Sequence, residues 1–338
     1  MAKHRIIRVD YSGASYLPPY KVMDAIHRSV SKVNFYPYEG YAEICKAIAS
    51  YCGVREENIL VTNGGDEAIM LITTKFGPKI LIPTPTYGEY EYIAKSRDYS
   101  ITKRNCLSDS GEYRICYTKK DLGWATLAWI CNPNNPTGTL IPKKDIMGII
   151  NGTDAMVVVD EAYYEFSGQT VAKEVDNHRN LIVLRTFSKG FGIAGLRLGY
   201  IIAHPSIIKM FSKYNQEYNV NRVARAAGIA ALKSRRHYQR RIFEAKKRRD
   251  NFQKFAESIG VHAFKSNGGF IFLKFSDMRE ADYVYGRFLD EGIITFISTD
   301  AEFSGLEGPY MRLALSNTIN MKVIQRSLAR IISEYRSQ

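Results

Sequence analysis

The sequence has few cysteines, and they follow no spacing typical of a metal site or a disulfide framework. Five cysteines are spread over 338 residues, and none belongs to a Cys-x-x-Cys pair. Because structural zinc sites and disulfide scaffolds need such spacing, neither is expected to organise this fold. We expect the five to pack as small buried hydrophobic residues: Cys45, Cys52, Cys106, Cys116 and Cys131.

The chain also lacks the sequence features of a secreted or membrane protein. Its longest apolar runs have only the length of a strand, and the opening Met-Ala-Lys-His-Arg contains no apolar segment of a signal peptide. No repeat or low-complexity tract interrupts the sequence. We therefore expect a cytoplasmic protein without a membrane partner, with one large domain and a smaller one.

Acidic residues are scarce relative to basic ones. The formal net charge of +13 at pH 7 favours anionic partners, such as phosphorylated cofactors and substrates, and would also suit nucleic acid. The most basic stretch is residues 233–250, where Tyr238, Ile242 and Ala245 recur at helical spacing. This spacing favours a half-buried helix with a solvated basic face, so we expect no nucleic-acid partner.

Strand-like apolar runs alternate with helical patterns through the first two thirds of the chain. This alternation predicts an α/β fold, in which helices sandwich a mostly parallel sheet. The predicted strands are residues 59–62, 79–83, 126–131, 156–160, 181–184 and 198–203. Residues 100–126 give no clear pattern.

The last part of the chain returns to strands. Residues 269–275 and 310–316 have the pattern of strands on either side of a helix near 281–291, which predicts a smaller, βαβ-like domain. We expect a large domain over residues 35–235. The small domain would combine residues 1–34 with residues 236–338.

One lysine stands where an open α/β sheet presents its ligand crevice. Lys189 follows the apolar run 181–184, next to the hydroxyl groups of Thr186 and Ser188, a set of glycines, and Arg197. Hydroxyls, glycines and an arginine suit a phosphate-bearing cofactor, and a lysine can bind an aldehyde as a Schiff base. We therefore interpret Lys189 as the attachment point of pyridoxal phosphate.

Polar groups also follow other predicted strands. Between a strand and a helix start, Asn63-Gly-Gly-Asp-Glu67 favours an anion at the helix N-terminus, although it also suits a plain turn. Asn135 lies in a proline-rich turn, where its amide can donate to a phenolate oxygen. Asp160 ends a buried run, as either a functional acid or a helix cap. Tyr87, near the same sheet edge, could stack on a ring or simply pack.

Taken together, these motifs resemble a known family. Asn135-Pro-Thr-Gly138, Asp160-Glu-Ala-Tyr163 and Thr186-Phe-Ser-Lys189 with Arg197 are similar in order to the class I/II pyridoxal-phosphate aminotransferases of fold type I. Tyr36-Pro37, Gly64-Gly-Asp-Glu67 and Ala194-Gly-Leu-Arg197 resemble its histidinol-phosphate aminotransferase branch. The resemblance implies a seven-stranded sheet in the large domain and a smaller α+β domain.

The resemblance also implies what the catalytic residues do. Lys189 would hold the cofactor as a Schiff base and move the proton of the substrate Cα. Asp160 would keep the pyridinium nitrogen protonated, so that the ring can accept electrons. Asn135 and Tyr163 would donate hydrogen bonds to the ring oxygen, and Tyr87 would stack on the ring.

Further residues would bind the cofactor phosphate and the substrate. The phosphate would be held by Gly65, Asp66, Thr186, Ser188 and Arg197. Arg312, with Asn135, would bind the α-carboxylate of amino-acid and 2-oxo-acid substrates. Tyr36 would reach the cofactor of the partner subunit, which implies a homodimer with shared active sites.

The sequence departs from this branch at positions that would select the substrate. Gly13-Ala-Ser-Tyr16 stands where the branch has an Asn-Glu-Asn-Pro-like turn. Gly292-Ile-Ile294 is followed by Thr295-Phe-Ile-Ser298, without the arginine that the branch uses for a substrate phosphate. Arg222 could replace that charge, whereas Phe296 suits an aromatic or apolar side chain.

The first interpretation is therefore a histidinol-phosphate:2-oxoglutarate aminotransferase or a close paralogue. Two alternatives are an aminotransferase for aromatic or apolar amino acids and a threonine-phosphate decarboxylase. A more remote alternative is a regulator that binds pyridoxal phosphate without catalysing a reaction.

Overall fold

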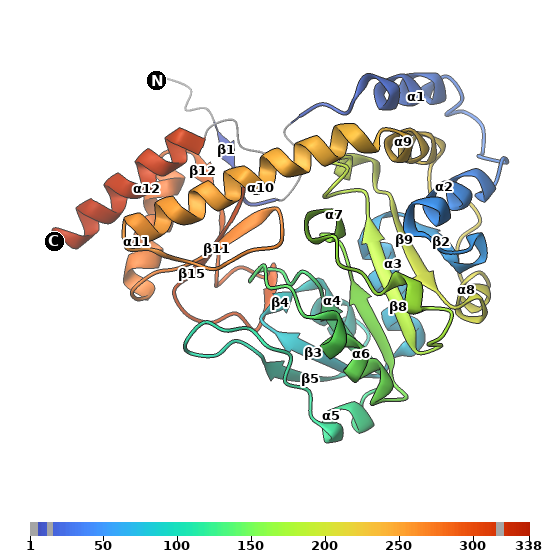
Figure 1. The fold of residues 1–338 in the computed structure, drawn as a ribbon, viewed down its shortest axis with the longest axis horizontal. Helices are drawn as coiled ribbons and strands as arrows, with labels where there is room; N and C mark the ends of the chain where they lie inside the picture. The colour runs from blue at the N-terminus through green and yellow to red at the C-terminus, as the bar shows by residue number, and fades with distance from the viewer. Residues whose placement is uncertain (1–5, 12–15, 316–320) are drawn as a thin grey trace.

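A seven-stranded sheet lies at the centre of the larger part of the molecule (Figure 1). The computed structural model describes residues 6–11, 16–315 and 321–338; the sequence-based expectations for residues 1–5 and 13–15 lie outside this part. The sheet has the order β2-β9-β8-β7-β6-β3-β5. Within it β9 runs antiparallel to β2 and β8, and the remaining neighbours pair in parallel. The strands are β2 (Ile59–Thr62), β3 (Lys79–Thr84), β5 (Ser100–Asn105), β6 (Leu127–Cys131), β7 (Met156–Asp160), β8 (Leu181–Thr186) and β9 (Gly199–Ala203).

Helices cover both faces of this sheet, which explains why its central strands are continuously apolar. Val157 and Val159 of β7 face one hydrophobic core, and Val158 between them faces another. The first core includes α2 (Ala42–Cys52), α6 (Lys143–Asn151), α7 (Tyr164–Ser167) and α9 (Arg222–Lys233). The second includes α3 (Gly64–Phe76), α4 (Glu89–Lys95) and α8 (Pro205–Phe211). The expected α/β fold is confirmed.

A second, four-stranded sheet builds the smaller part, in the order β10-β11-β15-β13. All its pairs are antiparallel, so the expected βαβ-like arrangement of residues 269–275 and 310–316 is wrong. The segment between β11 and β15 contains short strands as well as a helix, and the chain returns in the opposite direction. Its elements are β10 (His262–Ala263), β11 (Phe270–Lys274), α11 (Met278–Asp290), β12 (Ile293–Ile294), β13 (Phe296–Ile297), β14 (Phe303–Ser304), β15 (Tyr310–Ala314) and α12 (Met321–Arg336).

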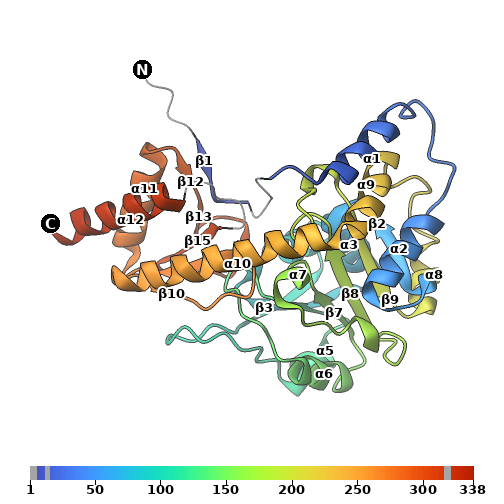
Figure 2. The same ribbon diagram turned by 45° about the horizontal axis from the view of Figure 1, so that its top comes forward.

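Helix α10 (Arg235–Ser258) connects the two parts (Figure 2). Tyr238, Ile242 and Ala245 belong to the core of the larger part, whereas Phe252 and Ala256 belong to that of the smaller part. The basic stretch is thus a half-buried helix, as its spacing predicts. A boundary at residue 235 falls at the first residue of this shared helix.

The N-terminal segment contributes to both parts. Strand β1 (Ile7–Arg8) pairs in parallel with β12 of the smaller part. Helix α1 (Tyr20–Val30) instead lies along α9, and its Val22 belongs to the larger core. Residues 20–30 therefore pack with the larger part, which differs from the expected grouping of residues 1–34 with the small domain.

The cysteines only partly follow the expected burial. Cys52, Cys106 and Cys131 are buried, Cys45 is partly buried, and Cys116 is exposed. In the described part of the chain, no helix combines the length and apolar character needed to cross a membrane.

The close approach of β9 to the start of α3 can be tested at Gly199. A Cβ atom there would lie 2.6 Å from the carbonyl carbon of Gly64. We expect Gly199→Ala to lower the free energy of unfolding by about 1–3 kcal/mol, because backbone atoms would have to move. Gly148→Ala is the matched control: its Cβ would meet nothing within 4 Å, and alanine favours a helix. Urea denaturation of the cofactor-free protein measures both; equal stability of Gly199→Ala and the parent would contradict the packing described.

Candidate active site

The carboxyl ends of β6, β7 and β8 border a cavity of about 440 Å³. Ligands bind at this edge of open α/β sheets, because loops diverge there and leave a crevice. The cavity wall contains ten of the residues selected from the sequence: Gly65, Asp66, Tyr87, Asn135, Asp160, Tyr163, Thr186, Ser188, Lys189 and Arg197. Strands far apart in the sequence thus bring these side chains together.

Asp160 is a buried acid at the end of β7. Its side chain accepts a hydrogen bond of 2.6 Å from the hydroxyl of Tyr90 and one of 3.0 Å from the backbone N–H of Ala162. Burial raises the pKa of Asp160 to about 6, and the bond from Tyr90 opposes this shift. In the described part of the chain no cationic side chain forms an ion pair with it. Asp160 could therefore hold a cationic N–H group of a ligand.

Lys189 lies on the loop after β8, with its ammonium group 5.7 Å from the centre of the Tyr163 ring. Tyr163 is buried and packs edge-on against Phe270 of the smaller part, with ring centres 5.0 Å apart. Asn135, on the turn after β6, completes this side of the wall. An amine, a phenol and an amide around one cavity suit a ligand with a reactive carbonyl and a phenolate oxygen.

The opposite end of the cavity suits an anion. Gly65 and Asp66 lie in the first turn of α3, where unpaired N–H groups and the helix dipole favour negative charge. Thr186 donates a hydrogen bond of 3.0 Å to Ser188, so two hydroxyl groups lie side by side. Arg197 donates one of 2.6 Å to Asp66, and both side chains are partly exposed. The guanidinium can therefore turn to a phosphate at little cost.

Arg312, in the second sheet, and Phe296 are not part of the cavity lining, but Arg312 contacts two residues that are, Asn135 and Glu302. It is 1% exposed and donates hydrogen bonds to the side chain of Asn135 and to the carbonyl of Asp10, the latter at 2.6 Å. Its guanidinium lies 5.1 Å from the ring centre of Phe296, and Phe296 in turn packs edge-on against Tyr11, which lines the cavity. A cation held among aromatic rings is well placed for a carboxylate that also contacts an apolar group.

Besides Arg312 and Phe296, three further selected residues lie outside the lining of this cavity: Tyr16, Tyr36 and Arg222. Tyr16 packs beside His237 and Arg241, and burial raises its pKa to about 12. Tyr36 is 64% exposed. Arg222 lines a separate cavity of about 300 Å³ and donates a hydrogen bond of 3.0 Å to the carbonyl of Tyr36.

Sequence reasoning missed a partner of Asp160, Tyr90, and a charged residue of the cavity wall, Glu302. Tyr90 is fully buried in α4 and reaches the site only through its hydrogen bond to Asp160, a long-range contact that no local pattern marks. Glu302 lies on an irregular loop, 3.6 Å from Arg312, and no local pattern distinguishes it. Burial raises the pKa of Glu302 against the opposing effects of Arg312 and Lys189.

The burial of Asp160 predicts that the free energy of unfolding of the cofactor-free protein depends on pH. Its folded pKa of about 6 exceeds that of an unfolded aspartate, about 3.9. The unfolded state thus loses this proton first, so the free energy of unfolding falls as the pH rises from about 4 to 6, by about 3 kcal/mol. We expect Asp160→Asn to gain about 2–3 kcal/mol over the parent at pH 8 and little at pH 4. Chemical denaturation at both pH values measures this, with the exposed Asp145→Asn as control; a gain independent of pH would contradict it.

Comparisons with known proteins show which family this chain resembles. The sequence profile of the family described as aminotransferase class I and II matches residues 9–328. A histidinol-phosphate aminotransferase of Thermoanaerobacter pseudethanolicus is 35% identical over 318 residues, which cover 92% of this chain and 88% of the relative.

Solved structures share the fold. The histidinol-phosphate aminotransferase of Sinorhizobium meliloti in complex with pyridoxal-5'-phosphate superposes with a TM-score of 0.86 at 22% identity, covering 98% of this chain and 92% of that one. An L-threonine-O-3-phosphate decarboxylase of Porphyromonas gingivalis gives 0.81 at 22% identity, covering 98% and 100%. The extent of the family match and the identity to the Thermoanaerobacter protein lead to one conclusion: this chain belongs to the class I and II aminotransferase family.

Proposed function

We propose that this aminotransferase uses pyridoxal phosphate and that its cofactor lies in the 440 Å³ cavity. The observation that carries the proposal is the buried carboxylate of Asp160, which forms no ion pair with any described residue and shares one cavity with Lys189 and an anion-binding helix end. A protonated ring nitrogen would pair with Asp160, and a phosphate would lie at Gly65 and Arg197. The donor set therefore fits the cofactor at both ends.

When bound, pyridoxal phosphate supplies an aldehyde that condenses with amines and a ring that accepts the electron pair released at the substrate Cα. Lys189 Nζ would bind the aldehyde carbon and later move the proton of the Cα atom. The Asp160 carboxylate would keep a proton on the ring nitrogen. Asn135 and Tyr163 would donate to the ring oxygen, and Tyr87 would cover one face of the ring.

The remaining selected residues would bind phosphate and substrate. Thr186 and Ser188 would donate to the phosphate, together with the N–H groups at Gly65 and Asp66. Arg312 would bind the substrate α-carboxylate bidentately, beside Asn135.

A homodimer is part of the proposal, with Tyr36 of the partner subunit at each cofactor phosphate. Tyr36 and Tyr38 are 64% and 72% exposed, and both rings contact that of Tyr218. Exposed aromatic groups of this kind favour burial against another chain. The cytoplasmic location stays a prediction.

For the amino donor we propose histidinol phosphate, with 2-oxoglutarate as acceptor. The name of the Thermoanaerobacter relative supports this choice. An aromatic or apolar donor is the second candidate, because Tyr11 lines the cavity with Phe296 packed against it, and no arginine occurs in residues 295–298. Arg222 lies in another cavity of the chain, so a contribution to the phosphate would have to come across a subunit interface.

The role of Lys189 predicts the behaviour of Lys189→Ala. We expect this variant to lose the visible absorbance of the covalently bound cofactor and to lose turnover by at least about 1,000-fold, because among the described residues Lys189 is the one lysine that lines the cavity. Absorbance spectra and transamination assays measure the two effects. Lys144→Ala, which removes an exposed lysine of α6, is the control. Transamination at the parent rate in Lys189→Ala would refute the assignment.

The donor can be identified from the spectrum of the loaded enzyme. We expect histidinol phosphate to convert the cofactor to its amine form, ahead of tyrosine, phenylalanine, aspartate and threonine phosphate. Conversion by unphosphorylated aromatic donors alone would favour the second candidate. Release of carbon dioxide from threonine phosphate would instead identify a decarboxylase.

A further inference from the structure

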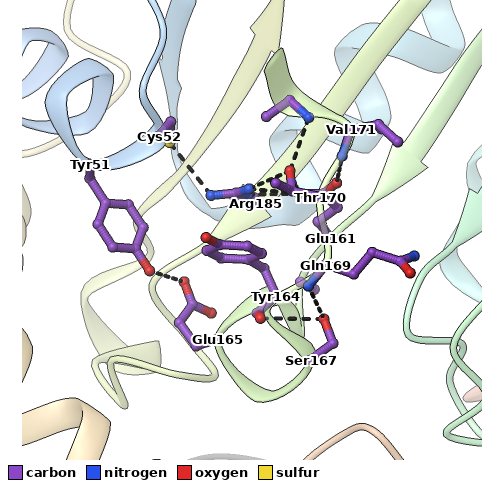
Figure 3. A network of polar contacts seen from close by, with 12 residues as sticks. Tyr51, Cys52, Glu161, Tyr164, Glu165, Ser167, Gln169, Thr170, Val171 and Arg185 are labelled. Atoms are coloured by element: carbon purple, nitrogen blue, oxygen red, sulfur yellow. Dashed lines mark hydrogen bonds and ion pairs between the residues drawn. The ribbon is translucent and has the colours of Figure 1, made fainter. Parts of the chain in front are cut away.

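A buried ion pair joins Glu161 and Arg185, which neighbour the cavity residues Asp160 and Thr186 in the sequence; Figure 3 shows its network of polar contacts. Its members, Glu161 and Arg185, are each 1% exposed. Glu161 follows Asp160 in the sequence, and Arg185 precedes Thr186. Successive side chains of a strand point to opposite faces, so the pair lies on the face of the sheet away from the cavity.

Hydrogen bonds and a ring contact hold both members of the pair in place. Arg185 donates from Nε and Nη2 to Oε2 of Glu161, at 2.9 and 2.8 Å, and from Nη2 to the hydroxyl of Thr170, at 2.7 Å. The other oxygen of Glu161 accepts a bond of 2.8 Å from the N–H of Val171. The guanidinium lies 3.5 Å from the ring centre of Tyr164. The planar fork of an arginine therefore has one defined orientation here.

The position of the pair matters because the regular strand pairing ends beside it. Asp160 and Leu184 are register partners, and the N–H of Glu161 donates to the carbonyl of Leu184 at 2.8 Å. Beyond this bond the two segments that follow β7 and β8 diverge: the first leads into α7 and the second into the loop of Lys189. The ion pair continues the connection one residue past the last backbone bond.

The α7 segment also packs directly on the lysine loop. A Cβ atom on Gly190 would lie 2.6 Å from Cβ of Glu165, so the side chain of Glu165 packs closely against the backbone of Gly190. Glu165 accepts a hydrogen bond of 3.1 Å from the hydroxyl of Tyr51 on α2, which fixes the first turn of α7 from the far side. A shift of α7 would therefore reach the residue next to Lys189.

We propose that Glu161 and Arg185 are positioning residues that hold Asp160 and the Lys189 loop in fixed relative places; this catalytic consequence rests on the proposed function. Buried ion pairs contribute little stability compared with apolar residues of similar volume. Their fixed geometry, at the ends of the two strands that carry the reacting groups, gives the pair a role in orientation. Loss of orientation lowers kcat, while binding of substrate is largely retained.

Hydrogen exchange in the cofactor-free protein tests the pair without any assumption about activity. Arg185→Lys keeps the charge but not the fork, and we expect residues 160–165 and 186–192 to exchange at least about 10-fold faster by mass spectrometry. Arg185→Met should show a larger effect; if it fails to fold, Arg185→Lys decides. Lys143→Met breaks an exposed pair with Glu174 and should leave both segments unchanged. Exchange within twofold of the parent in folded Arg185→Lys would refute the proposal.

Steady-state kinetics then separate positioning from a purely structural role. We expect Arg185→Lys to lower kcat by about 10- to 100-fold, with KM changed by less than about threefold. Parent-like kcat in a destabilised Arg185→Lys would mean that the pair serves folding alone, and would overturn the proposal. Inactivity of the unaltered protein would count against the proposed function instead, since the exchange result stands without turnover.

Discussion

Burial of the Asp160 carboxylate is the constraint around which the site is built. An ionised acid inside a protein needs hydrogen bonds or a counter-charge, and this one has two hydrogen-bond donors, Tyr90 and Ala162, but no ion pair with residues 6–11, 16–315 or 321–338. Tyr90 is itself fixed by stacking on Trp129, with ring centres 4.3 Å apart. The protein therefore maintains a costly charge at the cavity wall, as expected where a cationic ligand atom completes the interaction.

Sheet topology determines which groups share that cavity. Strands β6, β7 and β8 are parallel neighbours, so the segments after them emerge at one edge and bring Asn135, Asp160 and Lys189 together. The opposite face at the same strand ends holds the Glu161–Arg185 pair. Successive side chains of a strand point to opposite faces, so the cavity residues lie on one face of the sheet and the orienting ion pair lies on the other. Arg312, from the second sheet, reaches this site through its hydrogen bond to Asn135.

Much of this arrangement could be predicted from the sequence, because it depends on local patterns. Buried runs mark the central strands, and the polar residue that ends each run marks the cavity edge. Strand β5 was missed because it is a mostly polar edge strand, Ser-Ile-Thr-Lys-Arg-Asn, with neither alternation nor an apolar run. The antiparallel β11 and β15 pair and the place of Arg222 depend on tertiary contacts that no local pattern encodes. Glu302 was missed for the same reason.

The affinity of the cofactor-free protein for pyridoxal phosphate, measured by fluorescence titration at pH 8 in the parent and in Asp160→Asn, tests the central claim most directly. If the buried carboxylate awaits a protonated ring nitrogen, the parent should bind about 100-fold more tightly than the variant, a difference of about 2.7 kcal/mol. Equal affinities would contradict the account, because Asp160 would then have no charge interaction with the cofactor.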